Sequence, residues 1–433
     1  MADARYTAAK LLDKTLKNGS YSNIQLNSGL ERSDLDGQGK KLCTAIYYGV
    51  IQRKLTLDYI LAQYCSRPLE KMDSIVVNIL RCGVYQLLYM DSIPDNAAVN
   101  ESVRLAKQFG KTSASGMVNA VLRSFIRDGK NIFKKAENNR IKRFSVMYSM
   151  PVELVESLVS DYGEETFVKF AEHSVKDGNF TYIRRNPLKC THEELTAALD
   201  VQLYTEDNLC YRFSGGITGT SAFKSGYFHV QDISSQLCCM ILAPTENDRV
   251  LDICAAPGGK TFTMAEMMNG KGEIYAFDLH EKRVKLIREG AERLGLGNIS
   301  AKTGDASVYN PDIPKCTKIL CDVPCSGFGV ISHKPEIRYK SLSEFERLPE
   351  IQYAIAENAL NYLAVGGEMV YSTCTVRKAE NEAVVEKLLK NHPELELAEI
   401  PQLYGRSFSN PVTFFPDIFD GDGFFAAKLK KVK

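Results

Sequence analysis

The residues of this chain best suited to covalent chemistry are two cysteines, and a glycine-rich turn lies upstream of both. Cys325 stands in the run Asp-Val-Pro-Cys-Ser at 322–326, and Cys374 in the run Ser-Thr-Cys-Thr at 372–375. Upstream, residues 251–261 read Leu-Asp-Ile-Cys-Ala-Ala-Pro-Gly-Gly-Lys-Thr. A glycine-rich turn before a helix suits a nucleotide-like cofactor, and two thiols beyond it point to covalent attack on an electrophilic ring. The combination predicts methyl transfer to a ring carbon that a thiolate must first activate.

Carbon 5 of cytosine is such a carbon, because it is too weak a nucleophile to take a methyl group from a sulfonium unaided. A thiolate that adds to carbon 6 makes the ring an enamine, and a base later removes the carbon-5 proton. Asp322 can hold the N3–N4 edge of the ring. Lys260 can lower a thiol pKa, stabilise charge or cap its helix. The residues alone leave open which cysteine is the nucleophile.

Two further acids follow predicted strands. Asp278 ends the strand after the turn, where a carboxylate can accept hydrogen bonds from both ribose hydroxyls of an adenosine-type cofactor. Asp305 follows the third strand, where it can meet an adenine amino group. Each acid alone is more often a turn or cap residue, but their shared placement favours a cofactor role. The turn lacks the G-x-G-x-x-G pattern, which disfavours a dinucleotide.

Alternating strands and helices position these motifs. We expect strands at 249–254, 273–278, 299–303, 318–322 and 368–372, with helices at 261–268, 281–294 and 351–363 between them. This alternation predicts an α/β, doubly wound, mostly parallel sheet of Rossmann-like type. Ligands of such sheets bind beyond the carboxyl ends of the strands, so the motifs should meet at one edge.

The rest of the chain predicts two other folds. Helical periodicity at 6–17, 38–64, 75–90, 95–109 and 113–127 predicts an all-α bundle. Short helices at 151–161 and 164–173, a strand at 180–185, a capping box at 191–194 and a strand at 227–230 predict a small α+β domain. We therefore expect three domains: a helical domain at 1–130, a basic linker with a small α+β domain at 131–230, and a catalytic domain at 231–433.

Composition and cysteine usage describe an ordinary globular protein. The 433 residues are 44% hydrophobic and 25% charged, which is more chain than one core usually organises. Residues 1–17 have no apolar core of a signal peptide, and the apolar stretch 75–90 is interrupted by Asn78, Arg81 and Gln86. No two of the 12 cysteines have C-x-x-C spacing, so we expect reduced thiols, no metal and a cytoplasmic location.

Charge is distributed unevenly along the chain. Residues 1–145 hold 23 Lys and Arg against 13 Asp and Glu, whereas the remainder holds 31 against 40. A basic module joined to a mildly acidic one suits polyanion binding next to catalysis. A basic run at 127–143 either contacts phosphates or is a solvated linker, and the sequence does not choose between them.

Four segments give the chain its family resemblance. Residues 251–261, 322–329, 366–375 and 421–425 resemble the NOL1/NOP2/Sun family of S-adenosylmethionine-dependent RNA cytosine-5 methyltransferases. Residues 95–103 and 116–123 are similar to signatures of the NusB-like helical domain that precedes the catalytic domain in one branch of that family. That branch forms 5-methylcytosine in small-subunit (16S) ribosomal RNA.

The resemblance assigns roles to individual residues. It implies that Cys374 is the nucleophile and that Cys325 assists product release, although DNA cytosine methyltransferases use the Pro-Cys cysteine as nucleophile. Asp322 and Lys260 complete the implied catalytic set. The implied S-adenosylmethionine ligands are Cys254, Ala255, Ala256, Pro257, Gly258, Gly259, Lys260, Asp278, Asp305 and Asp322.

Substrate contacts follow from the chemistry. The target cytosine must leave its stack to reach a thiol, which predicts a single-stranded or loop cytosine. The family resemblance implies that this cytosine lies in ribosomal RNA and that the helical domain at 1–130 and the domain at 131–230 bind RNA. We also expect a monomeric enzyme. Candidate RNA contacts are Arg184, Arg185, His333, Lys334 and Arg338, with solvated surface as the alternative for the last three. Alternatives for the function are methylation of another RNA such as tRNA, a non-enzymatic NusB-like RNA-binding adaptor, and a nicotinamide-dependent oxidoreductase, which the missing G-x-G-x-x-G disfavours.

Overall fold

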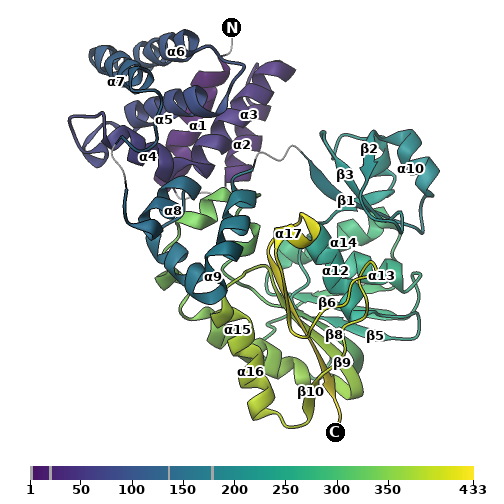
Figure 1. Ribbon diagram of the computed structural model, residues 1–433. Helices are drawn as coiled ribbons and strands as arrows, with labels where there is room; N and C mark the ends of the chain where they lie inside the picture. The colour runs from purple at the N-terminus through teal and green to yellow at the C-terminus, as the bar shows by residue number, and fades with distance from the viewer. Residues whose placement is uncertain (1–2, 19–21, 135–136, 177–179) are drawn as a thin grey trace. The chain divides into compact units, whose positions relative to one another are not determined.

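The chain forms two compact units in the computed structural model, which describes residues 3–18, 22–134, 137–176 and 180–433. Residues 1–176 and 331–342 make up the first unit, and residues 177–330 and 343–433 make up the second. Figure 1 shows helices alone in the first unit and two sheets with their helices in the second. The domain boundaries expected at 130 and 230 stay a prediction.

The first unit is the expected bundle. Its helices are α1 (Ala4–Asn18), α2 (Ser22–Glu31), α3 (Gly37–Gln52), α4 (Lys54–Ala62), α5 (Ser74–Tyr89), α6 (Asp95–Gln108), α7 (Ser115–Arg127), α8 (Arg140–Tyr148) and α9 (Val152–Ser174). Helix α5 is apolar on most faces and contributes Ile79, Leu80 and Val84 to the core. Asp73 caps it by accepting a hydrogen bond from the backbone N–H of Ile75.

One helix prediction in this unit is wrong and another is confirmed. The single helix expected at 38–64 is two helices, because Arg53 leaves the helical region (φ −108°, ψ 13°) between α3 and α4. The two short helices expected at 151–161 and 164–173 are confirmed as the two parts of α9, because the non-helical backbone of Gly163 (φ 77°, ψ 165°) separates them. Helix α2 was not expected.

A segment distant in sequence completes the helical unit. Residues 331–342 leave the second unit directly after the Pro-Cys region and include a 3₁₀ turn at Pro335–Tyr339. Within the helical unit, the Tyr339 hydroxyl donates to the carbonyl of Ile51 at 2.8 Å, and Glu336 accepts from the Ser22 hydroxyl at 2.7 Å. The chain therefore passes from the Pro-Cys loop into the bundle and back.

The second unit begins with the expected small α+β fold. Its antiparallel sheet has the order β2 (Val201–Leu203), β3 (Cys210–Phe213), β1 (Thr181–Arg185) and β4 (Phe228–Val230). Helices α10 (His192–Ala198) and α11 (Ser221–Lys224) accompany it. The capping box is confirmed, because Thr191 and Glu194 bond reciprocally at the start of α10. Strands β2 and β3 were not expected.

The large sheet confirms the α/β prediction. Its strands run in the order β10 (Leu395–Leu397), β12 (Phe424–Lys431), β9 (Leu363–Thr373), β8 (Cys316–Asp322), β5 (Arg249–Asp252), β6 (Glu273–Asp278) and β7 (Ile299–Thr303), and β11 (Val412–Phe414) pairs with β12. Strands β5 to β9 are parallel, whereas β10, β11 and β12 pair antiparallel. The carboxyl ends of β5, β6, β7, β8 and β9 therefore share one edge, as predicted.

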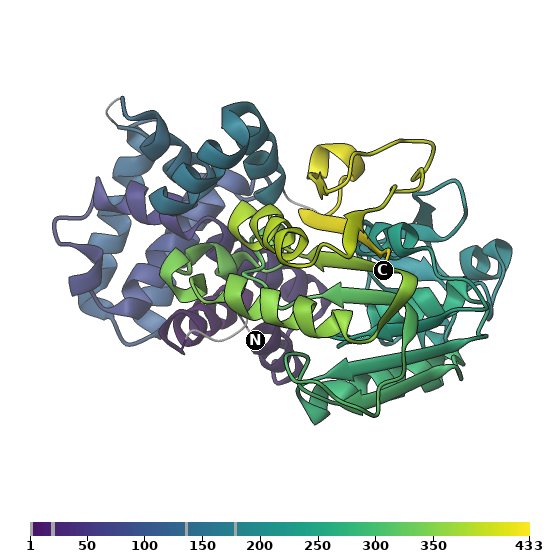
Figure 2. The same ribbon diagram turned by 90° about the horizontal axis from the view of Figure 1, so that it is seen from below.

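Helices cover both faces of this sheet. One apolar cluster joins it to α12 (Ile233–Leu242), α13 (Gly259–Met267) and α14 (Glu281–Leu294), and another joins it to α15 (Leu348–Leu360) and α16 (Glu382–Asn391). Figures 1 and 2 show α15 and α16, coloured green to yellow-green, on the face away from α12–α14. The short helix α17 (Pro416–Phe419) precedes β12. No helix in the described ranges combines the length and apolarity that crossing a bilayer requires.

Candidate active site

The glycine-rich turn joins β5 to α13 at the carboxyl edge of the large sheet. Gly258 has a left-handed backbone (φ 109°), and a Cβ there would lie 2.5 Å from the Phe262 ring, so only glycine fits without a shift. The helix then starts at Gly259 with its N–H groups free of intrahelical partners, which suits an anionic or polar ligand. Burial raises the pKa of Cys254 well above its ordinary value, so this thiol is not a nucleophile.

A buried carboxylate lies under this turn. Asp252 accepts a hydrogen bond from the Thr261 hydroxyl at 2.7 Å, which ties α13 to β5. Its other oxygen is buried without a hydrogen-bond partner among the described residues. Burial raises the pKa of Asp252 to about 7. The sequence analysis did not single out Asp252 or Thr261.

Asp278 and the turn are joined by an arginine that sequence reasoning missed. Asp278 ends β6 and is 4% exposed. Arg283 of α14 pairs with its carboxylate at 3.1 Å and donates to the carbonyl of Ala256 at 2.7 Å. This arginine therefore holds the predicted ribose acid beside the turn. An arginine five residues after a strand-end acid was the available signal.

Asp305 lines a cavity of about 230 Å³ beyond β5, β6 and β7. Ile253 and Phe277 give this cavity apolar walls, and Tyr309 and Tyr362 lie at another side. Asp305 is exposed and accepts hydrogen bonds from the Ser307 hydroxyl and backbone N–H, which lower its pKa. An apolar slot with a carboxylate at its rim suits a purine ring with an exocyclic amino group.

The two motif cysteines meet at the same edge. Strands β8 and β9 are parallel neighbours with Asp322 opposite Ser372, so the loops after them run side by side. The two Sγ atoms are 3.1 Å apart, and both residues are half-buried. The hydrogen bond to Cys374 and then burial raise the pKa of Cys325 well above its ordinary value. Cys325 therefore stays a thiol at neutral pH.

Lys260 and Asp322 form an ion pair next to the thiols. The Lys260 ammonium lies 2.7 Å from one Asp322 oxygen, and the Ser372 hydroxyl donates to the other at 2.8 Å. Burial acts to lower the pKa of Lys260, but the charge of Asp322 outweighs it and raises that pKa. Lys260 is therefore a permanent cation beside a carboxylate and not a helix cap, since α13 has no side-chain cap.

The closing motif at 421–425 completes this edge. The Gly423 N–H donates to the carbonyl of Gly329 at 2.9 Å, and the Gly329 N–H donates to the carbonyl of Cys374 at 3.0 Å. A Cβ on Gly329 would lie 1.9 Å from the Gly423 carbonyl oxygen, so the contact requires glycine. Three segments singled out in the sequence thus converge on the thiols.

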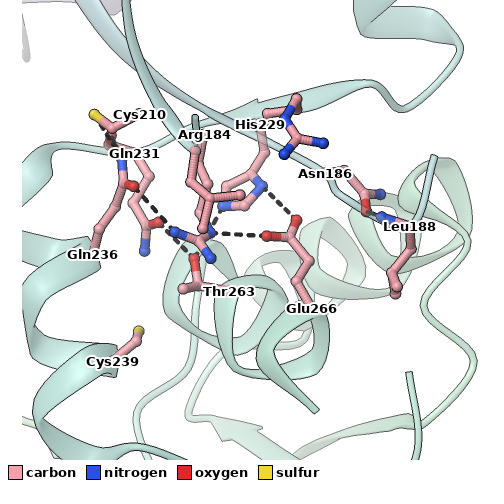
Figure 3. A network of polar contacts seen from close by, with 12 residues as sticks. Arg184, Asn186, Leu188, Cys210, His229, Gln231, Gln236, Cys239, Thr263 and Glu266 are labelled. Carbon is pink, nitrogen blue, oxygen red and sulfur yellow. Dashed lines mark hydrogen bonds and ion pairs between the residues drawn. The ribbon is translucent and has the colours of Figure 1, made fainter. Parts of the chain in front are cut away.

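The predicted RNA contact at Arg184 is wrong. Arg184 is 2% exposed, because β1 packs on α13. Its guanidinium pairs with Glu266 at 2.8 Å and donates to Gln236 at 3.3 Å, as Figure 3 shows. His229 of β4 lies 3.3 Å from the other Glu266 oxygen. The cluster fastens the small sheet to α13. Arg185 is half-buried, and its guanidinium donates to the carbonyls of Asn208 and Cys190.

The predicted RNA contact at Arg338 is also wrong. Arg338 is fully buried in the helical unit and donates to four backbone carbonyls, those of Gln52, Tyr148, Ser174 and Ile331. The first three carbonyls belong to the last residues of α3, α8 and α9, where helix dipoles place partial negative charge. Its role is structural. His333 and Lys334 are exposed, and their RNA contacts stay predictions.

The basic run at 127–143 is partly neutralised. Lys134 pairs with Asp128 at 3.1 Å, Arg140 with Glu164 at 2.5 Å and Lys142 with Glu137 at 3.0 Å. Lys135 lies outside the described residues. Whether the run contacts phosphates stays a prediction.

Comparisons with known proteins divide the chain in a similar way. The family described as "16S rRNA methyltransferase RsmB/F" matches residues 239–430, and the NusB family matches residues 2–127. The probable ribosomal RNA small subunit methyltransferase B of Bacillus subtilis is 36% identical over 99% of this chain and 98% of its own length. The protein of the same name from Synechocystis is 32% identical over the whole of both chains.

Solved structures agree on the fold. The crystal structure of PH0851 has a TM-score of 0.81 at 24% identity and covers 100% of this chain and 99% of its own. NSun6 from Pyrococcus horikoshii with SFG has a TM-score of 0.59 at 24% identity and covers 66% of this chain and all of its own. At these identities the structural likeness concerns the fold alone.

Proposed function

Because the chain belongs to the 16S rRNA methyltransferase RsmB/F family, we propose that it transfers a methyl group to carbon 5 of a cytosine in small-subunit ribosomal RNA through a covalent thiol adduct. The observation that carries this proposal is the pair of thiols 3.1 Å apart, one kept protonated, beside the turn at 254–260. A methyltransferase acting on an oxygen or an exocyclic nitrogen needs no such pair.

S-adenosylmethionine fits the residues at the carboxyl edge of the large sheet. The apolar slot with Asp305 at its rim suits adenine, and the buried Asp278 suits the ribose hydroxyls. The N-terminus of α13 and the turn at 254–260 suit the remaining polar groups. The bound cofactor supplies an electrophilic methyl group on a sulfonium.

The proposed roles of the cysteines follow the family resemblance, and the raised pKa of Cys325 agrees with them. Cys374 adds as a thiolate to carbon 6 of the cytosine, which makes carbon 5 nucleophilic. Cys325 stays a thiol, so it can protonate the Cys374 sulfur as the carbon-6–sulfur bond breaks, and the Cys325 thiolate so formed can accept the proton that leaves carbon 5. Asp322 accepts a hydrogen bond from the exocyclic N4, and Lys260 holds that carboxylate in place.

The substrate is a cytosine outside a stacked duplex, since the base must reach thiols at the ends of strands. Exposed His333 and Lys334 follow the Pro-Cys loop by a few residues and are suited to contact RNA phosphates. The matched NusB-family region supports a second RNA-binding surface in the helical unit.

A tritiated methyl-transfer assay on small-subunit ribosomal RNA tests the proposal. Cys374→Ala should abolish turnover, whereas Cys325→Ala should accumulate a covalent protein–RNA adduct on a denaturing gel. Cys65→Ala is the matched control, because Cys65 is also half-buried but lies in the helical unit. If the two site variants exchange these phenotypes, the cysteine roles are reversed. Methylation of tRNA but not ribosomal RNA would favour the other substrate, and no transfer to any RNA would favour an adaptor.

A further inference from the structure

The two thiols lie on loops, so their separation depends on what holds those loops. Residues 323–330 form the Cys325 loop after β8, and residues 374–381 form the Cys374 loop after β9. A covalent step needs reacting groups held within fractions of an ångström, and a loop supplies this only when other groups fix it.

One buried carboxylate touches both loops. Glu380 ends the 3₁₀ turn Lys378–Glu380 and is fully buried. One oxygen accepts from the Ser326 backbone N–H at 2.8 Å, directly after Cys325. The other pairs with the Arg377 guanidinium at 3.1 Å on the Cys374 loop. A single side chain therefore fixes the backbone next to one thiol to the loop of the other.

Helix α15 closes this cluster. The Gln352 amide donates to Glu380 at 3.0 Å and to the carbonyl of Pro324 at 2.9 Å, on the other side of Cys325. The Tyr371 hydroxyl donates to the Glu380 carbonyl at 2.6 Å and anchors its backbone to β9. Cys325 is thus held through both neighbouring residues by groups that converge on Glu380.

The charge of Glu380 has a second consequence. A buried carboxylate is costly to the fold unless it is paired and hydrogen-bonded, and here Arg377, Ser326 and Gln352 supply those bonds. Its negative charge, together with that of Asp322, adds to the effects of Cys374 and burial that raise the pKa of Cys325. The same group that orients the Cys325 loop therefore helps to keep its thiol protonated.

We propose that Glu380 is a positioning residue for methyl transfer, which sets the approach of Cys325 to Cys374 without touching RNA or cofactor. This inference rests on the proposed function for its catalytic consequence, but its geometric part does not. The carboxylate is buried beneath the loops, so its removal takes away no direct contact with RNA or cofactor.

Glu380→Gln is the primary test, because the amide keeps the volume and can still accept from Ser326. We expect kcat to fall about tenfold or more, with the KM for RNA and the cofactor Kd within about twofold of wild type. Covalent adduct should accumulate during turnover, because the step that Cys325 assists slows. Glu368→Gln is the matched control, since it removes a carboxylate paired with Lys318 and Lys428 earlier on β9.

A measurement without RNA keeps the inference testable if turnover is lost for other reasons. The rate at which dibromobimane bridges Cys325 and Cys374, scored by the mass of the linked peptides, reports the approach of the two thiols directly. We expect bridging to slow about tenfold in folded Glu380→Gln and more in Glu380→Ala. Wild-type bridging or unchanged kcat in the folded variants would overturn the inference. If wild-type protein transfers no methyl group, the proposed function is wrong. The bridging rate would still test whether Glu380 sets the approach of the two thiols.

Discussion

Helix α13 has an ion pair near each end, and the two pairs differ in what they can do. Lys260 and Asp322, near its N-terminus, have side chains 15% and 25% exposed, at the edge where the thiols lie. Glu266 and Arg184, near its C-terminus, are 0% and 3% exposed beneath the small sheet. The first pair can exchange partners with a bound molecule, whereas the second is sealed and can only stabilise the fold. Solvent access, more than residue type, separates a functional ion pair from a structural one.

Breaking the buried pair of Arg184 and Glu266 should give the largest effect, which is a loss of folding stability. Arg184→Met leaves the Glu266 charge buried without its partner, so we expect the free energy of unfolding to fall by about 3–5 kcal/mol. Urea unfolding followed by circular dichroism measures this. The double variant Arg184→Met/Glu266→Leu should recover much of the loss, because it removes both charges. A double variant no more stable than Arg184→Met would argue against the sealed pair as the cause.

The open pair should act on the rate instead. Lys260→Met removes the cation that fixes Asp322, and we expect kcat to fall about 10²–10³-fold, with the unfolding free energy lowered by about 1–3 kcal/mol, less than at Arg184, because the pair is partly open to water. Single-turnover methyl transfer and urea unfolding of the same preparation measure the two quantities. Lys271→Met is the control, since Lys271 pairs with Glu246 on an exposed surface just beyond the same helix. Equal loss of stability at Lys260 and Arg184 would remove the distinction.

Asp252 extends the comparison to a buried acid bonded to Thr261 of α13. Its pKa is raised to about 7 in the folded protein, so the protonated form stabilises the fold. That contribution is complete below the unfolded-state pKa near 4 and is lost as the pH rises through about 7. Asp252→Asn should therefore gain stability relative to wild type by about 2–3 kcal/mol between pH 5 and pH 8. Parallel stability curves over this range would show that the acid is not protonated in the fold.

The smallest expected effect is on RNA binding, and it should distinguish the exposed Lys334 from the buried Arg338 in the segment 331–342. Lys334→Ala should weaken RNA binding severalfold and lower the slope of log affinity against log salt by about one unit. Arg338→Met should leave that slope unchanged and lower the stability of the helical unit, because its guanidinium holds three helix ends. Filter binding over a salt series and thermal unfolding separate the two. A salt slope altered by Arg338→Met alone would reverse the assignment.

The sequence predicted those parts of the site whose positions depend on strand boundaries and on the pairing of neighbouring parallel strands. Strands β6 and β7 match their predicted ranges, because turn residues bound both and β6 is an apolar run. Because β8 and β9 are parallel neighbours, Asp322 lies opposite Ser372. Cys325 and Cys374 therefore come into contact although 49 residues separate them in the sequence. Strands β10 and β11, with three residues each, and helix α2 gave too weak a periodic signal, whereas β12 is buried along six successive residues and shows no alternation.

Burial of the arginines could not be predicted in the same way. Arg184 reaches Glu266 across 82 residues, and Arg338 reaches the Ser174 carbonyl across 164. Sequence periodicity does not connect residues so far apart in the chain. A charged residue at a strand end or after a catalytic loop is therefore predicted to be exposed. Glu380 was missed for the same reason, since its partners come from the Cys325 loop, α15, β9 and its own loop.

The central claim is that the Cys374 sulfur bonds to carbon 6 of a cytosine. Fluorine at carbon 5 replaces the proton that must leave, so small-subunit RNA containing 5-fluorocytidine should stop the reaction at the methylated adduct. Digestion and mass spectrometry of this complex, formed with S-adenosylmethionine, should place one nucleotide on Cys374 in the wild-type protein and none in Cys374→Ala. An adduct on Cys325, or full methylation of ordinary RNA with no adduct on either cysteine, would contradict the account.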